Sequence, residues 1–234
     1  MKVKIFGERN CGTRVLAVLL QKNLGAEIFP STAAELDPWG YDRLAGDIEA
    51  GIDIENGIDA IFRNVDAAHS WKHCATNFED VGSFADCLTI FLVKHPLSWL
   101  VSLFDRPYHQ IGPGARTVAE LAGSSWQTVE RERLNCRAYK PFDLYREKIA
   151  SYLDLAPRIR SVFVRFEDVV SEPEKVVREL GLKGPFNPHE QSTKDQGKTL
   201  VDYRIHYAEE RWRQKVADLT DHPDWDQVRK FGYR

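Results

Sequence analysis

Residues 7–14 hold the side chains and glycines that best suit binding of an anion. After a short β-type segment come Arg9, Asn10, Cys11, Gly12, Thr13 and Arg14. A turn between a strand and a helix directs backbone N–H groups and the positive helix end at one point, which suits a phosphate. Gly12 permits close approach of the backbone, Thr13 adds a hydroxyl, and Arg9 and Arg14 add charge. The lysine and hydroxyl of the Walker motif GxxxxGK[ST] are missing. An ordinary structural turn is the alternative, because a glycine turn between a strand and a helix is common in α/β folds.

Two further segments add a cation and a base. Lys94 ends an apolar run, and Ser102 follows eight residues later on an expected helix. They converge on one anion only if that helix folds back beside the turn; otherwise they are surface residues. In Trp71-Lys72-His73, His73 is the candidate base, because an imidazole suits proton abstraction near neutral pH. A lone histidine is more often structural.

The elements that position these segments alternate between strand and helix. Residues 3–6, 87–93 and 161–166 read as strands, and residues 13–24, 96–104 and 140–155 as helices. The continuous apolar run 87–93 fits a strand buried on both faces. We therefore predict a three-layer α/β/α fold with a central, mostly parallel sheet, in which ligands bind at the carboxyl ends of the strands.

The net charge of −3 hides an uneven distribution. Residues 31–60 carry eight acids and one base, Arg43, so this stretch has a charge of −7 and the remainder +4. We read 31–60 as an acidic insert or long loop within one domain spanning 1–234. Residues 183–234 are expected to form a C-terminal loop and helices. The charged segment 126–137 reads as a helix face by default, or as lining of an acceptor cleft.

Composition excludes several classes of protein. A chain with 43% apolar and 29% charged residues is neither disordered nor collagenous, and no apolar run is long enough to span a bilayer. Without a signal peptide, we expect a cytoplasmic protein with reduced cysteines. The near-neutral charge gives no indication of nucleic acid. No metal-ligand spacing is present, so no metal is predicted.

Four segments in this order resemble the PAPS-dependent sulfotransferases, which use 3′-phosphoadenosine 5′-phosphosulfate (PAPS) as sulfuryl donor and release the bisphosphate PAP. They are GERNCGT, WKH, KHPLSWLVS and VRFEDVVSEPEKVVRELGL. The resemblance covers about residues 1–182 and implies a P-loop-like fold. The GERN-x-GT form looks like a bacterial-type branch of the family.

The resemblance also implies roles for single residues. The loop from Arg9 to Arg14 would hold the 5′-phosphosulfate, Lys94 and Ser102 the 3′-phosphate, and His73 would be the catalytic base, with Lys72 and Arg9 as catalytic cations. Phe166 falls where the family has a tyrosine near adenine. Lys194 and Lys198 loosely resemble the late basic loop that closes over the 3′-phosphate; a flexible charged loop is the alternative. Glu167 and Asp168 are expected to fix a strand exit.

The departures from the family pattern are specific. The loop lysine falls on Asn10, so its charge must come from Arg9, Arg14 or Lys72. The 3′-phosphate arginine falls on Lys94, which keeps the charge but loses the bidentate fork. A stacking aromatic falls on Val15.

The implied activity is in-line transfer of the sulfuryl group from PAPS to a hydroxyl, or an amine, of a small-molecule or carbohydrate acceptor, without a metal. The alternatives are a P-loop nucleotide kinase or NTPase, and a non-catalytic nucleotide-binding protein on the same fold. The acceptor and the oligomeric state are not readable from the sequence.

Overall fold

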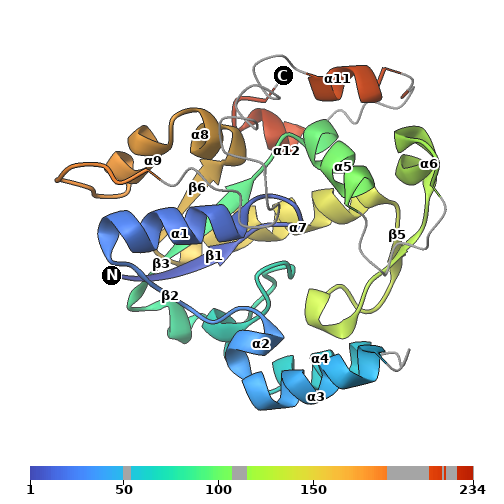
Figure 1. Cartoon of the computed structure of the whole chain (residues 1–234), viewed down its shortest axis with the longest axis horizontal. Coiled ribbons are helices and arrows are strands. Elements are labelled where there is room, and N and C mark those ends of the chain that lie inside the picture. Colours follow the sequence, from blue (N-terminus) through green and yellow to red (C-terminus); the bar gives the residue numbers. More distant parts are fainter. Residues whose placement is uncertain (50–53, 107–114, 189–210, 218, 220–225, 234) are drawn as a thin grey trace.

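The computed structural model describes residues 1–233, apart from 50–53, 107–114, 189–210, 218 and 220–225. Its centre is a parallel sheet of four strands, in the order β2–β1–β3–β6 (Figure 1). The strands are β1 (Lys2–Phe6), β2 (Glu27–Ile28), β3 (Cys87–Val93) and β6 (Ser161–Arg165). β1 pairs with β3 and β3 with β6, so that Phe6 lies opposite Phe91 and Phe91 opposite Phe163. The prediction of a mostly parallel sheet is confirmed.

Helices cover both faces of this sheet. Val3 and Ile5 of β1 belong to a core shared with Leu16 and Leu19 of α1 (Thr13–Leu24), and with α8 (Phe166–Ser171) and α9 (Pro173–Glu179). Phe6 belongs to a second core, shared with α5 (Pro96–Asp105) and α7 (Pro141–Leu155). All seven residues of β3 are buried, as expected for a parallel strand covered on both sides. The three-layer prediction is therefore confirmed.

The parallel arrangement brings the predicted segments to one edge of the sheet. Phe6 leads into the turn at 7–12, Val93 leads to Lys94, and Arg165 leads to Phe166, the first residue of α8. Because β1, β3 and β6 run in the same direction, all three exits lie at the same edge.

The acidic stretch is helical where the structure describes it, rather than a loop. It forms α2 (Ala33–Leu36), α3 (Pro38–Glu49) and the start of α4 (Glu55–Phe62), seen in blue and cyan in Figure 1. At the start of α2, the Glu35 carboxylate accepts the backbone N–H groups of Ser31 and Thr32, at 2.9 and 3.0 Å. Several of its described acids and glycines lie on these helices, which bury few residues, and helix propensity alone is a weak guide in such a segment.

Segment 126–137 is not a helix. It holds β4 (Trp126–Gln127) and a 3₁₀ turn at Glu130–Glu132, and β4 pairs antiparallel with β5 (Ala138–Tyr139). Arg133, Asn135 and Cys136 have φ values of 59°, 57° and 51°, which an α-helix does not permit. The prediction of a charged helix face at 126–137 is therefore wrong. Arg131 and Glu132 are instead buried.

The remaining described helices are short. They are α6 (Val118–Gly123), α11 (Arg211–Lys215) and α12 (Asp226–Arg229). Much of the expected C-terminal loop, including Lys194 and Lys198, lies outside the described residues. In the described part of the chain, every helix is too short or too polar to cross a lipid bilayer.

Candidate active site

The turn between β1 and α1 has a left-handed backbone at two points. Asn10 has φ 62° and Gly12 has φ 83°. A side chain on Gly12 would meet the ring of Phe166, because an added Cβ would lie 2.3 Å from its Cε2. The Cys11 N–H donates to the Glu8 carbonyl at 3.1 Å, and the indole N–H of Trp99 donates to the Arg9 carbonyl at 2.9 Å. The turn is therefore fixed on both sides before α1 begins at Thr13.

Lys94 and Ser102 converge beside this turn. Lys94 Nζ donates to Ser102 Oγ at 2.7 Å and to the Asn10 carbonyl at 3.2 Å. The same ammonium lies 4.6 Å from the centre of the Phe166 ring. The condition set by the sequence, that the helix after β3 folds back beside the turn, is met by α5. The Lys94 ammonium and the Ser102 hydroxyl therefore lie next to each other beside the turn at 7–12.

Tyr145, which the sequence does not single out as a site residue, holds the backbone at Lys94. The buried Tyr145 hydroxyl donates to the Lys94 carbonyl and accepts from the Lys94 N–H at 3.1 Å. Burial raises the pKa of Tyr145 well above its ordinary value, so it keeps the proton that this donation needs. In the sequence, the place of Tyr145 on the apolar face of the helix at 141–155 indicates that it is buried.

Glu167 fixes the same strand exit, as expected of a structural acid. One carboxylate oxygen accepts the His95 N–H at 2.9 Å, and the other accepts the Tyr233 hydroxyl at 2.6 Å. Asp168 pairs with Arg165 at 2.6 Å. Tyr233 lies near the end of the chain, so the C-terminal segment is tied to the edge of the sheet that carries Lys94.

Removing the Tyr233 hydroxyl should destabilise the chain where it leaves β3, because Glu167 would lose one of its two partners there. For Tyr233→Phe we expect the free energy of unfolding to fall by about 1–3 kcal/mol, the range for losing a hydrogen bond to a charged group. Urea unfolding measures it, with Tyr139→Phe as control. The Tyr139 hydroxyl makes no hydrogen bond among the described residues, so this change should cost less than about 0.5 kcal/mol. Equal costs for the two variants would contradict a role for the Tyr233–Glu167 contact.

His73 is held against the first residue of the turn. Its Nδ1 lies 2.5 Å from the Gly7 carbonyl oxygen, and the Gly7 N–H donates to the Lys72 carbonyl at 2.9 Å. A carbonyl oxygen only accepts, so Nδ1 carries the proton and Nε2 carries the lone pair. Burial lowers the pKa of His73 well below its ordinary value, and the charges of Lys72 and Arg9 lower it further. The imidazole is therefore neutral, with one defined basic nitrogen.

Arg9 is enclosed rather than directed at the space beside the turn. Its side chain is fully buried, and its guanidinium lies 4.5 Å from the ring centre of Trp71 and 4.6 Å from that of Trp126. It pairs with Glu132 at 2.6 Å and with Glu8 at 3.4 Å. The Arg9 side chain is therefore part of the buried packing around the turn.

Comparison with known proteins finds a similarity of fold and no significant similarity to a family model or a curated protein. No protein-family model matches the sequence, and no curated protein is significantly similar to it. A search of solved structures finds the sulfotransferase domain of the olefin synthase from Synechococcus PCC 7002, with a TM-score of 0.53 and 16% identity, covering 100% of this chain and 94% of that one. The chain has a sulfotransferase fold.

Two further sulfotransferase structures are less similar. The domain from the curacin biosynthetic pathway has a TM-score of 0.48 at 15% identity, covering 99% of this chain and 97% of that one. The sulfotransferase of Alicyclobacillus acidocaldarius has a TM-score of 0.44 at 17% identity, covering 92% of each chain.

On this sulfotransferase fold, the other predicted residues are spread over the turn and its surroundings. Thr13 and Cys11 are buried, and burial raises the pKa of the Cys11 thiol, which keeps it neutral. Arg14 is exposed and Lys72 is half-buried, whereas Phe166 is buried against Gly12. Asn10 donates from its side chain to the Arg106 carbonyl at 3.3 Å.

The cysteines and other metal-binding side chains are dispersed over the described part of the chain. Within the described ranges, no group of three His, Cys, Asp or Glu side chains is placed to hold a metal ion. All four cysteines are free thiols, three of them buried and Cys136 exposed.

Proposed function

We propose that this chain is a PAPS-dependent sulfotransferase. The observation that carries the proposal is the convergence of Lys94, Ser102 and the turn at 7–12, with His73 bonded to the first residue of that turn. A cation and a hydroxyl for one phosphate, backbone donors for another, and a neutral base then lie at one edge of the sheet. The sulfotransferase fold supports this assignment.

Each part of the donor has candidate contacts. We propose that Lys94 and Ser102 bind the 3′-phosphate, which distinguishes PAPS from ATP. The turn from Asn10 to Thr13 would bind the 5′-phosphate through its backbone at the start of α1. Lys72 and Arg14 would supply the charge that Asn10 lacks, and Phe166 would lie near the adenine. Lys194 and Lys198 remain sequence-based proposals for the 3′-phosphate.

The reaction needs one proton transfer and one exchange of bonds. The acceptor oxygen, or nitrogen, attacks sulfur and forms the new bond while the bond between sulfur and the phosphate oxygen breaks. His73 Nε2 takes the acceptor proton, and PAP leaves with the electron pair of the broken bond. Charge gathers on the departing oxygen, where backbone N–H groups and Lys72 would stabilise it. The sulfuryl group carries a single charge, so our proposal includes no metal.

The partner classes follow from this chemistry. We propose a small-molecule or carbohydrate acceptor, no nucleic acid, and a cytoplasmic location, in keeping with the free thiols. The rival functions are an NTPase or kinase, and a binding protein without activity. Calorimetry separates the first rival: PAP binding supports our proposal, whereas binding of ATP with Mg²⁺ but not PAP would overturn it. Release of PAP from PAPS in the presence of an acceptor panel separates the second.

Lys94 offers a direct test of the donor site. For Lys94→Met we expect PAP affinity to fall roughly 10- to 100-fold, the equivalent of a charge-assisted hydrogen bond. Lys175→Met, which removes an exposed lysine paired with Glu172, is the matched control and should bind PAP like the unchanged protein. Unaltered PAP affinity in Lys94→Met would remove this residue from the donor site.

A further inference from the structure

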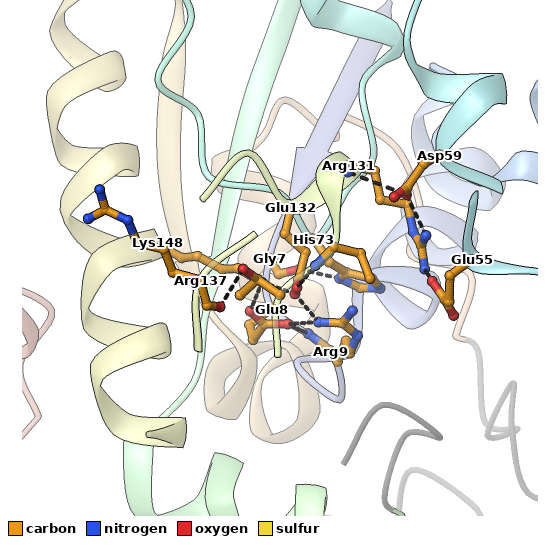
Figure 2. Close-up of polar contacts among 12 residues, drawn as sticks. Gly7, Glu8, Arg9, Glu55, Asp59, His73, Arg131, Glu132, Arg137 and Lys148 are labelled. Carbon is orange, nitrogen blue, oxygen red and sulfur yellow. Dashed lines mark hydrogen bonds and ion pairs between the residues drawn. The ribbon is translucent and has the colours of Figure 1, made fainter. Parts of the chain in front are cut away.

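Beneath the turn lies a group of four buried charged residues, which we call the ionic cluster: Glu8, Arg9, Glu132 and Lys148. Their side chains are at most 1% exposed. Lys148 pairs with Glu8 and, at 3.0 Å, with Glu132, and Arg9 pairs with Glu132 at 2.6 Å. Figure 2 shows the four side chains directed at one another. The cluster contains two acids and two bases, and each of these buried side chains is paired with at least one of opposite sign.

The cluster joins three parts of the chain that are distant in sequence. Glu8 and Arg9 belong to the turn, Glu132 ends the 3₁₀ turn at 130–132, and Lys148 lies on α7. Coulombic attraction to Lys148 and Arg9 overcomes burial and lowers the pKa of Glu132 to about 2. Glu132 therefore stays ionised at neutral pH. The sequence signal for Lys148 was its place on the apolar face of its helix, between Tyr145 and Ile149.

Glu132 also holds the segment that carries His73. Its backbone carbonyl accepts the Ala75 N–H at 2.9 Å, two residues beyond His73. Its side chain binds Arg9, whose guanidinium packs on Trp71, and the ring of Trp71 lies 5.2 Å from that of His73, edge to face. Glu132 thus contacts two segments, the one that contains His73 and the turn that begins at Gly7. These are the segments joined by the hydrogen bond from His73 to the Gly7 carbonyl.

We propose that Glu132 and Lys148 are positioning residues that fix the turn and, through the Gly7 carbonyl, the ring orientation and tautomer of His73. Arg9 belongs to this group, because its enclosed guanidinium links Glu132 to Trp71. Neither Glu132 nor Lys148 contacts His73 in any described hydrogen bond or ion pair. The catalytic consequence rests on the function proposed above, whereas the geometric claim does not.

The test reads the His73 ring directly by nitrogen NMR of the full chain, with His73→Asn identifying its signals. In the unchanged protein we expect the proton on Nδ1. In Glu132→Gln and Lys148→Met we expect this signal to move toward a mixture of tautomers and the PAP affinity to fall at least threefold. Glu130→Gln, which alters an exposed acid paired with Arg63, is the matched control and should change neither.

Two additional variants apply if a buried charge left without its partner prevents folding. The double variant Glu132→Gln/Lys148→Met removes one charge of each sign, and Lys148→Arg keeps the charge at a different length. We expect Lys148→Arg to preserve the Nδ1 tautomer better than the double variant. If a folded variant lacking the Glu132 carboxylate shows the unchanged tautomer and PAP affinity, the positioning role is wrong. If the unchanged protein does not bind PAP, the proposed function fails instead, and the tautomer still decides the positioning role.

Discussion

Replacing Gly12 with alanine is expected to destabilise the protein and to remove PAP binding. The backbone at Gly12 has φ 83°, which costs a residue with a side chain roughly 1–2 kcal/mol. The new Cβ would also lie 2.3 Å from a carbon of the buried Phe166 ring, and overpacking of this kind costs roughly 1–3 kcal/mol. Together these terms give a loss of about 2–5 kcal/mol in the free energy of unfolding, measured in urea.

The chain offers a matched control for the two causes. Gly25, which ends α1, has φ 57° but nothing within 4 Å of an added Cβ. Gly25→Ala therefore carries the backbone strain without the clash, and should cost only about 1–2 kcal/mol while PAP affinity stays unchanged. The double variant Gly12→Ala/Phe166→Leu should recover part of the lost stability. A cost for Gly12→Ala no larger than that for Gly25→Ala would show that Phe166 moves aside freely.

The second large effect concerns His73. In His73→Asn we expect turnover of PAPS to fall roughly 10²- to 10⁴-fold, the contribution of a general base. The asparagine amide can still donate to the Gly7 carbonyl, so PAP affinity should remain within about threefold, because the turn stays in place. PAP release with an acceptor panel gives turnover, and calorimetry gives affinity. His69→Asn, outside the site, is the control; unchanged turnover in His73→Asn would exclude it as the base.

The pH profile provides independent evidence on the same residue. Burial lowers the pKa of His73 well below 6.5, so the neutral, basic form persists at pH values where an exposed histidine is already protonated. We expect kcat/KM to stay constant from neutral pH to below 6.5 and to fall only as the pH drops through the lowered pKa. In His73→Asn this acid limb should vanish. An acid limb centred at or above 6.5 would contradict the buried, neutral state.

Much of the fold was predictable because its signals are local. The apolar run at 87–93 and Pro96 just after it predict β3 and α5. The sequence leaves open whether α5 folds back to bring Ser102 beside Lys94, and the structure shows that it does. The parallel sheet followed from the alternation of strands and helices. In a parallel sheet the carboxyl ends of the strands lie at one edge, so the common location of the segments that follow β1, β3 and β6 could be predicted as well.

The parts that could not be predicted depend on contacts between distant residues. Nothing in the run at 126–137 reveals that Glu132 is buried between Arg9 and Lys148, because its two partners lie 123 and 16 residues away. The surroundings of Arg9 are equally hidden in the sequence, because Trp71 and Trp126, whose ring centres lie 4.5 and 4.6 Å from its guanidinium, are distant along the chain.

The stacking of charged and aromatic groups around Trp71 has a consequence for protein engineering. Arg131 lies 4.8 Å from the ring centre of Trp71, on which Arg9 also packs, and Arg131 is bound by Glu55 and Asp59 of α4 (Figure 2). A graft that exchanges the acidic helices for those of another sulfotransferase fold would leave the Arg131 guanidinium buried without its two acids. Such a chimera must therefore transfer Glu55, Asp59 and Arg131 together, which means exchanging the segment around Arg131 as well as the acidic helices.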